Sequence, residues 1–234
     1  MVRAKKTPSS PEITVVSPHL DDAIFSTGAF VSALSRIGTR VRILTVFGND
    51  PSSTSLASAW DRSCGFATAG EAAIARRGED LRACGIVGAE ARWLPFLDSE
   101  NRVTFERQCV VAALHEHLTD GPVVAPMGPL IHPDHLLVVE MILEIVKPRS
   151  RVFGYLEQPY ASQALWARWI HDRRGVAMLG RESCQLSTSP ADWLRKYQAV
   201  SQYRSQLKSL SPLPRSRIFG FELFARGECI RCSV

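Results

Sequence analysis

The amino-acid sequence predicts an α/β fold of three layers, in which a mostly parallel β-sheet lies between two layers of helices. Short runs of β-branched and apolar residues alternate with longer segments of helical periodicity along most of the chain. The chain has 234 residues, of which 45% are hydrophobic, so it can bury a sizeable core. Because parallel strands are joined by crossovers, the alternation indicates right-handed βαβ units with helices on both faces of the sheet.

The first half of the chain contains three of the expected strands. The first two strands are rich in Val and Ile, and glycines close the helices between the strands. A polar connection rich in small residues reads as a long loop. In order, the segments are a strand at 12–17, a helix at 22–38 ended by Gly38, a strand at 40–47, the loop at 48–65, a helix at 67–85 ended by Gly85, and a short strand at 91–96.

The second half continues the alternation and completes a Rossmann-like sheet. Such sheets bind ligands outside the carboxyl ends of their strands, so the active site is expected there. Residues 1–12 are basic and then Pro/Ser-rich, which predicts a disordered lead before a single domain at 13–234. The remaining segments are a helix at 105–120, a strand at 121–128, a helix at 132–146, a strand at 151–157, an amphipathic helix at 191–210 and a terminal strand at 217–227.

Composition disfavours several classes of protein. The net charge is +5, but Arg3, Lys5 and Lys6 supply much of it, and no nucleic-acid-reading motif accompanies it. No apolar run reaches the roughly eighteen residues of a membrane span, and the amino terminus lacks the apolar segment of a secretory signal. Six scattered cysteines favour a cytoplasmic protein with reduced thiols. Cys229 and Cys232 have C-x-x-C spacing without a second pair, which favours ordinary thiols over a metal site.

Histidine and aspartate side chains follow two of the expected strands. His19 and Asp22 are three residues apart in the turn after the first strand, and His132 and His135 are three apart at the start of a helix. The topology can bring both segments to one edge of the sheet. Two imidazoles and a carboxylate suit a divalent metal and leave positions open for water and substrate, as in a catalytic zinc site.

Two further acids would have roles beside such a metal. Asp21 would take a proton from water, and Asp134 would orient a histidine. Each segment also has an ordinary structural explanation, because paired acids favour a helix N-terminus and "HPD" is a common turn into a helix. The presence of both segments at strand ends of one sheet favours the metal site.

The motifs "SPHLDDA" (17–23) and "HPDH" (132–135) resemble those of the PIG-L or LmbE-like family of metal-dependent N-deacetylases. The family's first motif is P/A-H-P-D-D-E, and its second is H-P-D-H or H-x-D-H. "RRGEDLRACGIVGA" (76–89) resembles the family's helix with Arg and Glu, and "YRSQ" (203–206) resembles its late Tyr-x-Ser-Gln segment. The resemblance covers about residues 13–224.

The resemblance implies an activity and a cofactor. The activity is hydrolysis of the N-acetyl or other N-acyl group of a small amino sugar or amine-bearing metabolite, for example one of secondary metabolism. Zn²⁺ is the implied cofactor, with Fe²⁺ or another divalent ion as the alternative. The implied roles are metal binding by His19, Asp22 and His135, general-base catalysis by Asp21, stabilisation of the oxyanion or help to the leaving amine by a protonated His132, and support of the site by Asp134.

The first motif departs from the family pattern at two positions. Leu20 replaces the usual proline, and Ala23 replaces the usual glutamate. Neither position is a ligand in the pattern, so the metal site should persist. The lost carboxylate at residue 23 suggests a subgroup whose acyl-amine substrate differs from the better-known glucosaminides.

Two other functions compete with the deacetylase. Two histidines and an aspartate also match the ligands of a non-haem iron oxygenase, but those sites usually lie in all-β barrels. A binding or regulatory protein on the same fold stays open, because a fold does not fix an activity. The expected partner is a small molecule rather than a nucleic acid or a membrane, and the sequence carries no signal for the oligomeric state.

Other segments give weaker signals. His115 and His117 are two residues apart and do not form an H-E-x-x-H motif, and Cys64 has no partner at catalytic spacing. The loop at 48–65 should border the crevice and is a candidate lid or specificity loop. The aromatic residues that could stack on a sugar, although core positions are commoner for them, are Trp60, Trp93, Phe96, Trp166 and Trp169.

Overall fold

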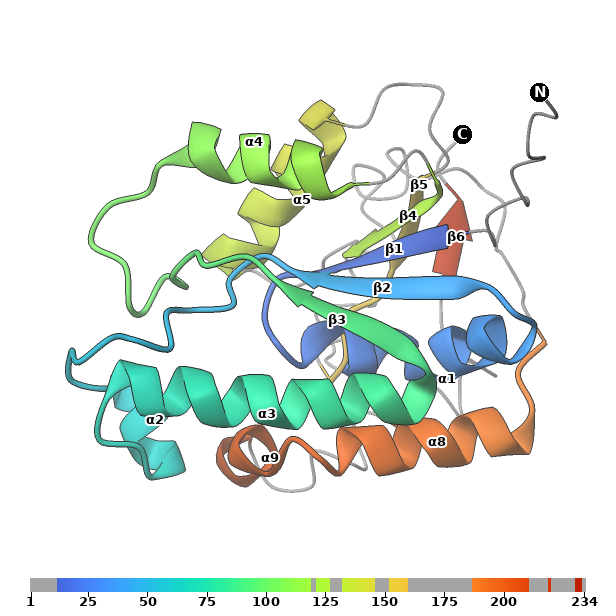
Figure 1. Cartoon of the computed structure of the whole chain (residues 1–234), viewed down its shortest axis with the longest axis horizontal. Helices are drawn as coiled ribbons and strands as arrows, with labels where there is room; N and C mark the ends of the chain where they lie inside the picture. The colour runs from blue at the N-terminus through green and yellow to red at the C-terminus, as the bar shows by residue number, and fades with distance from the viewer. Residues whose placement is uncertain are drawn as a thin grey trace, which may run out of the picture.

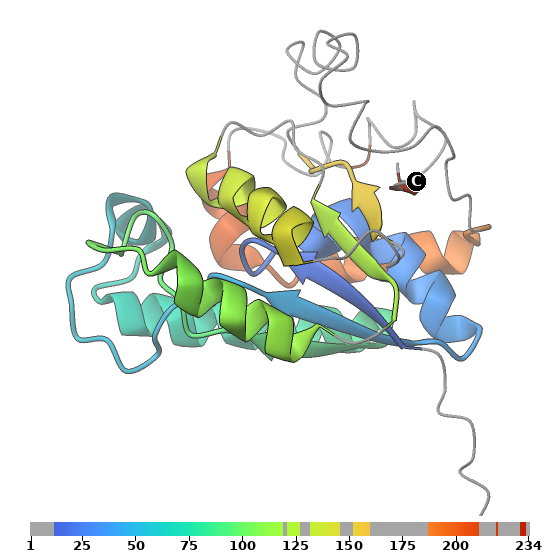
Figure 2. The ribbon, with the colours of Figure 1, turned by 90° about the horizontal axis from the view of Figure 1, so that it is seen from above.

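The computed structural model describes residues 12–118, 121–126, 132–145, 152–159, 187–210, 219 and 230–232. The lead expected at 1–12 lies outside these residues apart from Glu12, which already belongs to the first strand. The three-layer α/β fold predicted from the sequence is confirmed (Figures 1 and 2).

A six-stranded sheet forms the middle layer. Its strands, in spatial order, are β3 (Ala89–Trp93), β2 (Arg40–Thr45), β1 (Glu12–Ser17), β4 (Val123–Pro126), β5 (Val152–Tyr155) and β6 (Ile230–Cys232). Neighbours from β3 to β5 pair in parallel, and β6 pairs antiparallel with β5. The chain order reverses between β1 and β4. In doubly wound sheets, this switch point is where a crevice opens at the carboxyl ends of the strands.

Helices cover both faces of the sheet (Figure 1). Successive residues of a strand point to opposite faces, so Val15 packs with α1, α3 and α8, whereas Val16 packs with α4 and α5. The described helices are α1 (Asp22–Arg36), α2 (Ala59–Cys64), α3 (Ala69–Val87), α4 (Arg107–His117), α5 (Pro133–Ile145), α8 (Pro190–Val200) and α9 (Arg204–Ser209).

The first helix is held firmly between the sheet and α8. Residues 22–34 of α1 are all buried. Gly28 permits the close approach of α8, because a Cβ atom there would lie 2.9 Å from Cγ of Lys196. The amino terminus of α1, which carries Asp22, is therefore fixed against the core.

The "YRSQ" segment docks on α3 through two buried carboxylates. Tyr203 donates a hydrogen bond of 2.6 Å from its hydroxyl to Asp80, and the Ser205 hydroxyl donates one of 2.6 Å to Glu79. Tyr203 is 0% exposed. These bonds explain why the family-like segments at 76–89 and 203–206 occur together, since each satisfies the buried polar groups of the other.

Four predicted segments were wrong in extent or kind. The strand expected at 91–96 is β3 at Ala89–Trp93. Helix α3 continues through Gly85 to Val87 and ends at Gly88 (φ 79°), because Cys84 and Val87 both pack in the core. The loop expected at 48–65 contains the short helix α2. The helix expected at 191–210 is divided into α8 and α9, because the chain turns inward to bury Tyr203.

The terminal strand expected at 217–227 lies outside the described residues apart from Phe219. The edge strand β6 follows it at 230–232, where no strand was expected. β6 includes Cys232 of the C-x-x-C pair, and the other member, Cys229, lies outside the described residues.

Candidate active site

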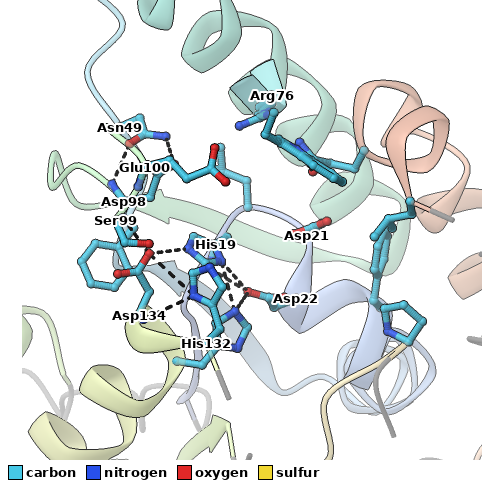
Figure 3. Close-up of a pocket in the computed structure, with 18 of the residues that line it drawn as sticks. His19, Asp21, Asp22, Asn49, Arg76, Asp98, Ser99, Glu100, His132 and Asp134 are labelled. Carbon is cyan, nitrogen blue, oxygen red and sulfur yellow. Dashed lines mark hydrogen bonds and ion pairs between the residues drawn. The ribbon is translucent and has the colours of Figure 1, made fainter. Parts of the chain in front are cut away.

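The turn after β1 and the start of α5 lie together at the switch point of the sheet (Figure 3). Ser17 shapes the turn, because its hydroxyl accepts the Ala23 N–H at 3.0 Å and donates to the His19 carbonyl at 2.5 Å. The backbone N–H of His19 also donates to Asp22 Oδ2 at 2.9 Å. The local sequence therefore folds the side chains of His19 and Asp22 toward one point.

Three ligand atoms converge there. Nδ1 of His19 lies 3.1 Å from Nε2 of His135, and Asp22 Oδ2 lies 3.4 Å from the first nitrogen and 3.3 Å from the second. Donors bound to one zinc ion at about 2.0–2.1 Å in tetrahedral geometry lie roughly 3.3 Å apart, so this set fits a divalent metal. His132 is close enough to be an alternative ligand, since ring nitrogens of the three histidines lie within 4.8 Å of one another.

A carboxylate contacts the outer nitrogen of each of the two facing imidazoles. Asp134 Oδ2 lies 3.1 Å from His19 Nε2, and Glu157 Oε1 forms a hydrogen bond with His135 Nδ1. Such contacts hold a ring in place and favour the proton on the outer nitrogen, which leaves the inner nitrogen to bind a metal.

The buried acids make the cluster attractive to positive charge. Burial alone would lower the pKa of His19, but hydrogen bonds to Asp134 and Asp22 outweigh it and raise the pKa to about 10. Burial is likewise outweighed at His135, whose pKa is raised by Asp22 and Glu157. The negative charge of these acids stabilises a proton on a histidine, and it would stabilise a metal cation in the same way.

Asp134 is fully buried and joins the cluster to the loop between β3 and α4. Arg102 Nη1 lies 2.6 Å from Asp134 Oδ1, and the Ser99 N–H donates to Oδ2 at 2.8 Å. Burial would raise the pKa of Asp134, but the bonds from His19 and Ser99 and the Arg102 charge hold it well below its usual range. The Arg102 guanidinium also lies over Phe105, 4.7 Å from the ring centroid.

His132 differs from the protonated donor that we expected from the sequence. Burial and the neighbouring His19 and His135 lower its pKa, because a further positive charge beside them is unfavourable. The backbone N–H of Asp134 donates to His132 Nδ1 at 3.3 Å. Since Nδ1 accepts this bond, a neutral His132 carries its proton on Nε2 and keeps one donor.

Asp21 lies beside the cluster but apart from its hydrogen bonds (Figure 3). It is the N-cap residue of α1, and within the described residues its side chain makes no capping bond. Burial and the charge of Asp22 raise the pKa of Asp21 to about 7. At Asp22, burial is outweighed by His135 and His19, and the pKa falls below its ordinary value.

A cavity of about 240 Å³ opens onto these groups. Trp60 of α2 forms part of its wall and donates from Nε1 to Gln206 at 3.3 Å, and Arg76 pairs with Asp61 at 2.5 Å. Asn49 also lines it, so the segment at 48–65 borders the crevice as expected, whereas its role as a lid stays a prediction. The other lining residues are His19, Leu20, Asp21, Asp22, Phe25, Phe47, Asp98, Ser99, Glu100, His132, Asp134, His135, Gln158, Pro159 and Leu210.

The remaining candidates lie elsewhere in the described part of the chain or outside it. Trp93 donates to Asp80 at 2.7 Å, and Phe96 packs against the core. Cys64 is half-buried beyond the pocket lining, and His115 is exposed on α4. His117 is half-buried, with Nδ1 2.9 Å from the carbonyl oxygen of Ala113. Trp166 and Trp169 fall outside the described residues.

Sequence reasoning missed three residues that support the cluster. Glu157 ends the expected strand at 151–157, and an acid at a strand's carboxyl end was a signal that could have found it. Arg102 and Ser99 lie in an irregular loop, and only the fold brings them to Asp134.

A family model described as "PIG-L: GlcNAc-PI de-N-acetylase" matches residues 14–146, which is more than half of the chain. The chain belongs to the PIG-L family. The resemblance read from the two motifs is thereby confirmed. No helix in the described part of this PIG-L chain is long and apolar enough to cross a membrane.

Similar proteins are deacetylases by name. A 2'-N-acetylparomamine deacetylase of Streptomyces fradiae is 32% identical in an alignment 169 residues long, which covers 64% of this chain and 57% of that protein. The chain therefore matches little more than half of its relative's length.

Solved structures of deacetylases share the fold. A deacetylase of the teicoplanin biosynthesis pathway has a TM-score of 0.80 at 23% identity and covers 95% of this chain and 98% of its own. The teicoplanin deacetylase has also been solved in a zinc-inhibited form, at a TM-score of 0.77 and 23% identity, covering 96% of this chain and 98% of its own. An antimicrobial pseudoaglycone deacetylase has a TM-score of 0.73 at 25% identity and covers 94% of both chains.

Proposed function

We propose that the protein is a metal-dependent N-deacetylase that removes the acetyl group from an amino sugar carried by a small molecule. One observation carries the proposal: His19 Nδ1, Asp22 Oδ2 and His135 Nε2 lie 3.1–3.4 Å from one another at the floor of a pocket that Asp21 also lines. Membership of the PIG-L family and the deacetylase relatives support the chemistry.

His19, Asp22 and His135 would hold the metal. Their donor set, two imidazoles and one carboxylate, is that of catalytic zinc sites and also suits iron or cobalt. When bound, the metal would lower the pKa of water and polarise the acyl carbonyl. Asp134 and Glu157 would keep the two histidine rings turned toward the metal position.

Asp21 would act as the general base. A base works best when its pKa lies near the operating pH, and the pKa of Asp21 is raised to about 7. Its carboxyl group lines the pocket and stands outside the ligand cluster, so it is free to accept a proton from the attacking water. The same proton would then pass to the leaving nitrogen, which departs as the free amine.

His132 would donate a hydrogen bond to the developing oxyanion. Its Nδ1 accepts the Asp134 N–H, so the neutral ring presents Nε2–H. A donor placed at an oxyanion typically stabilises the transition state by about 3 kcal/mol. This role does not need the protonated ring that the sequence led us to expect.

The pocket suits one sugar ring better than a whole large substrate. Its volume of about 240 Å³ is below the roughly 300–1,000 Å³ of sites that enclose drug-sized ligands. Trp60 offers an aromatic face, while Glu100 is a polar group for sugar hydroxyls. The acetamido sugar would enter the pocket and the rest of the molecule would stay outside.

The test is release of amine and acetate from N-acetylated amino sugars. The protein would be stripped of metal and reloaded with one equivalent of Zn²⁺, Co²⁺ or Fe²⁺, because a zinc-inhibited relative makes excess zinc unsuitable. We expect equimolar acetate and amine from 2'-N-acetylparomamine or from N-acetylglucosamine derivatives, and no release after chelation. A protein that binds the metal and cleaves none of these amides would favour a binding protein, and oxygen consumption would indicate an oxygenase.

A further inference from the structure

Glu157 is a buried carboxylate that neither family motif contains. It follows β5 directly, its side chain is 0% exposed, and Oε1 forms a hydrogen bond with Nδ1 of His135. Its segment is fixed on both sides. The Tyr155 hydroxyl donates to the Val16 carbonyl at 3.0 Å, and the Gln158 N–H donates to Ser26 Oγ at 3.0 Å.

Residue 23 packs in the same core cluster as Tyr155, which lies two residues before Glu157. Ala23, where the family motif has glutamate, is 1% exposed. Ser26 lies one turn further along α1 on the same face, since residues i and i+3 of a helix are neighbours. Because Ser26 contacts the backbone of Gln158, this face of α1 looks onto the residues that carry Glu157. A carboxylate from position 23 and one from position 157 would therefore approach the metal site from the same side.

We propose that Glu157 supplies from β5 the buried carboxylate that this chain lacks at residue 23, and that it positions His135 for metal binding. This inference rests on the proposed metal-dependent function. Glu157 acts through His135 and does not contact the substrate, so it is a positioning residue. It explains how the chain keeps a PIG-L site although the first motif ends in alanine.

Two physical effects give Glu157 this role. As an acceptor at Nδ1, it favours the proton on that nitrogen and leaves the Nε2 lone pair facing His19 and Asp22. As a buried anion, it needs a nearby cation, since its other oxygen, Oε2, has no hydrogen-bond partner among the described residues. A metal beyond His135 would provide that compensation.

The first experiment measures metal affinity. Zn²⁺ binding to the purified full chain would be measured by competition with a chromophoric chelator at pH 7, and the Co²⁺ form would give a visible spectrum. We expect Glu157→Gln to weaken binding by about 10- to 100-fold and to shift the Co²⁺ bands, with partial recovery in Glu157→Asp. Glu79→Gln is the matched control, because Glu79 is also buried but bonds Ser205. Affinity in Glu157→Gln within about twofold of wild type would overturn the proposal.

The second experiment moves the carboxylate. Ala23→Glu alone should weaken zinc binding, because two buried carboxylates would then compete for one histidine. The double variant Ala23→Glu/Glu157→Ala should bind zinc at least tenfold more tightly than Glu157→Ala alone. Independent, additive losses in the double variant would overturn the exchange of roles. If wild-type protein bound no divalent metal, the proposed function itself would fail, which is a separate result.

Discussion

Asp21 and Asp22 are adjacent in the chain, yet the fold drives their pKa values in opposite directions. Asp22 Oδ2 accepts the His19 N–H at 2.9 Å and lies 3.3 Å from His135 Nε2, so its ionised form is strongly favoured. At Asp21, burial together with the Asp22 charge outweighs the charges of His19 and Arg76, and the pKa is raised to about 7. The two carboxyl groups are therefore suited to different tasks, one as a ligand and one as a proton acceptor.

The first prediction concerns Asp21→Asn. The variant should keep its metal and lose about 10²- to 10⁴-fold in kcat, because the amide cannot accept a proton. In wild type, Asp21 must be ionised to act as a base, so kcat/KM should rise with pH through about 7 and then level off. The variant should lack this rise, as measured by deacetylation rates from pH 5.5 to 8.5. Asp50→Asn, which removes a carboxylate bonded to Ser52 away from the pocket, should leave the profile unchanged.

The second prediction separates ligands from catalytic residues among the histidines. His135→Ala should lose the metal, because His135 Nε2 faces both His19 and Asp22. His132→Ala should keep about one metal per chain and lose roughly 10²- to 10³-fold in kcat, as expected for one oxyanion donor. Elemental analysis after dialysis and single-turnover rates would measure both. Loss of metal from His132→Ala would instead indicate coordination by three histidines.

The third prediction concerns the Arg102 contact with Asp134. Arg102→Met keeps much of the packing over Phe105 but removes the guanidinium charge that pairs with the buried Asp134. The pKa of Asp134 should rise in this variant. Asp134 would then become protonated at a higher pH than in wild type and would lose its ion pair with the His19 ring. We expect kcat/KM to fall about tenfold at pH 7 and more at pH 6. Urea unfolding should show a loss of about 3 kcal/mol, since a buried ion pair is broken.

Arg107→Met is the control for Arg102→Met. Arg107 pairs with Glu144 at 2.5 Å, but both side chains are well exposed, at 39% and 52%. Exposed pairs contribute about 0–1 kcal/mol, so stability and the pH profile should hardly change. Equal effects of the two substitutions would show that Arg102 has no special link to the active site.

The sequence predicted the part of the site that short segments encode. His19, Asp21 and Asp22 are in one turn, and His132, Asp134 and His135 are at one helix start, so spacing alone placed each group. It did not predict Arg102 and Glu157, because they reach the cluster only through the packing of a loop and of β5. The positions of β1, β2, β4 and β5 followed from apolar runs rich in β-branched residues, whereas β6 was not expected. The division of α8 from α9 depends on the tertiary contact between Tyr203 and Asp80, and no local pattern encodes it.

The fourth prediction concerns the pH dependence of stability at Asp80. Burial raises the pKa of Asp80 to about 6, although hydrogen bonds from Trp93 and Tyr203 oppose the rise. The native state therefore keeps a proton at Asp80 that the unfolded chain releases near the ordinary carboxyl pKa of 3.8. The free energy of unfolding should fall as pH rises from about 4 to 6. Above that range, the native state carries the full destabilisation from the ionised, buried Asp80.

Asp80→Asn should abolish this dependence. Relative to wild type, the variant should gain on the order of 2 kcal/mol in unfolding free energy between pH 4.5 and pH 7.5, measured by urea titration. Asp192→Asn is the control, because bonds from Ser189 and Arg36 outweigh burial and lower its pKa. The stabilisation of the fold by ionised Asp192 is complete at any pH above the pKa that Asp192 has in the unfolded chain. This stabilisation is lost only in more acidic solution. The Asp192→Asn difference should therefore be constant over the same pH range, and a constant difference for Asp80→Asn as well would contradict the assignment of a raised pKa to Asp80.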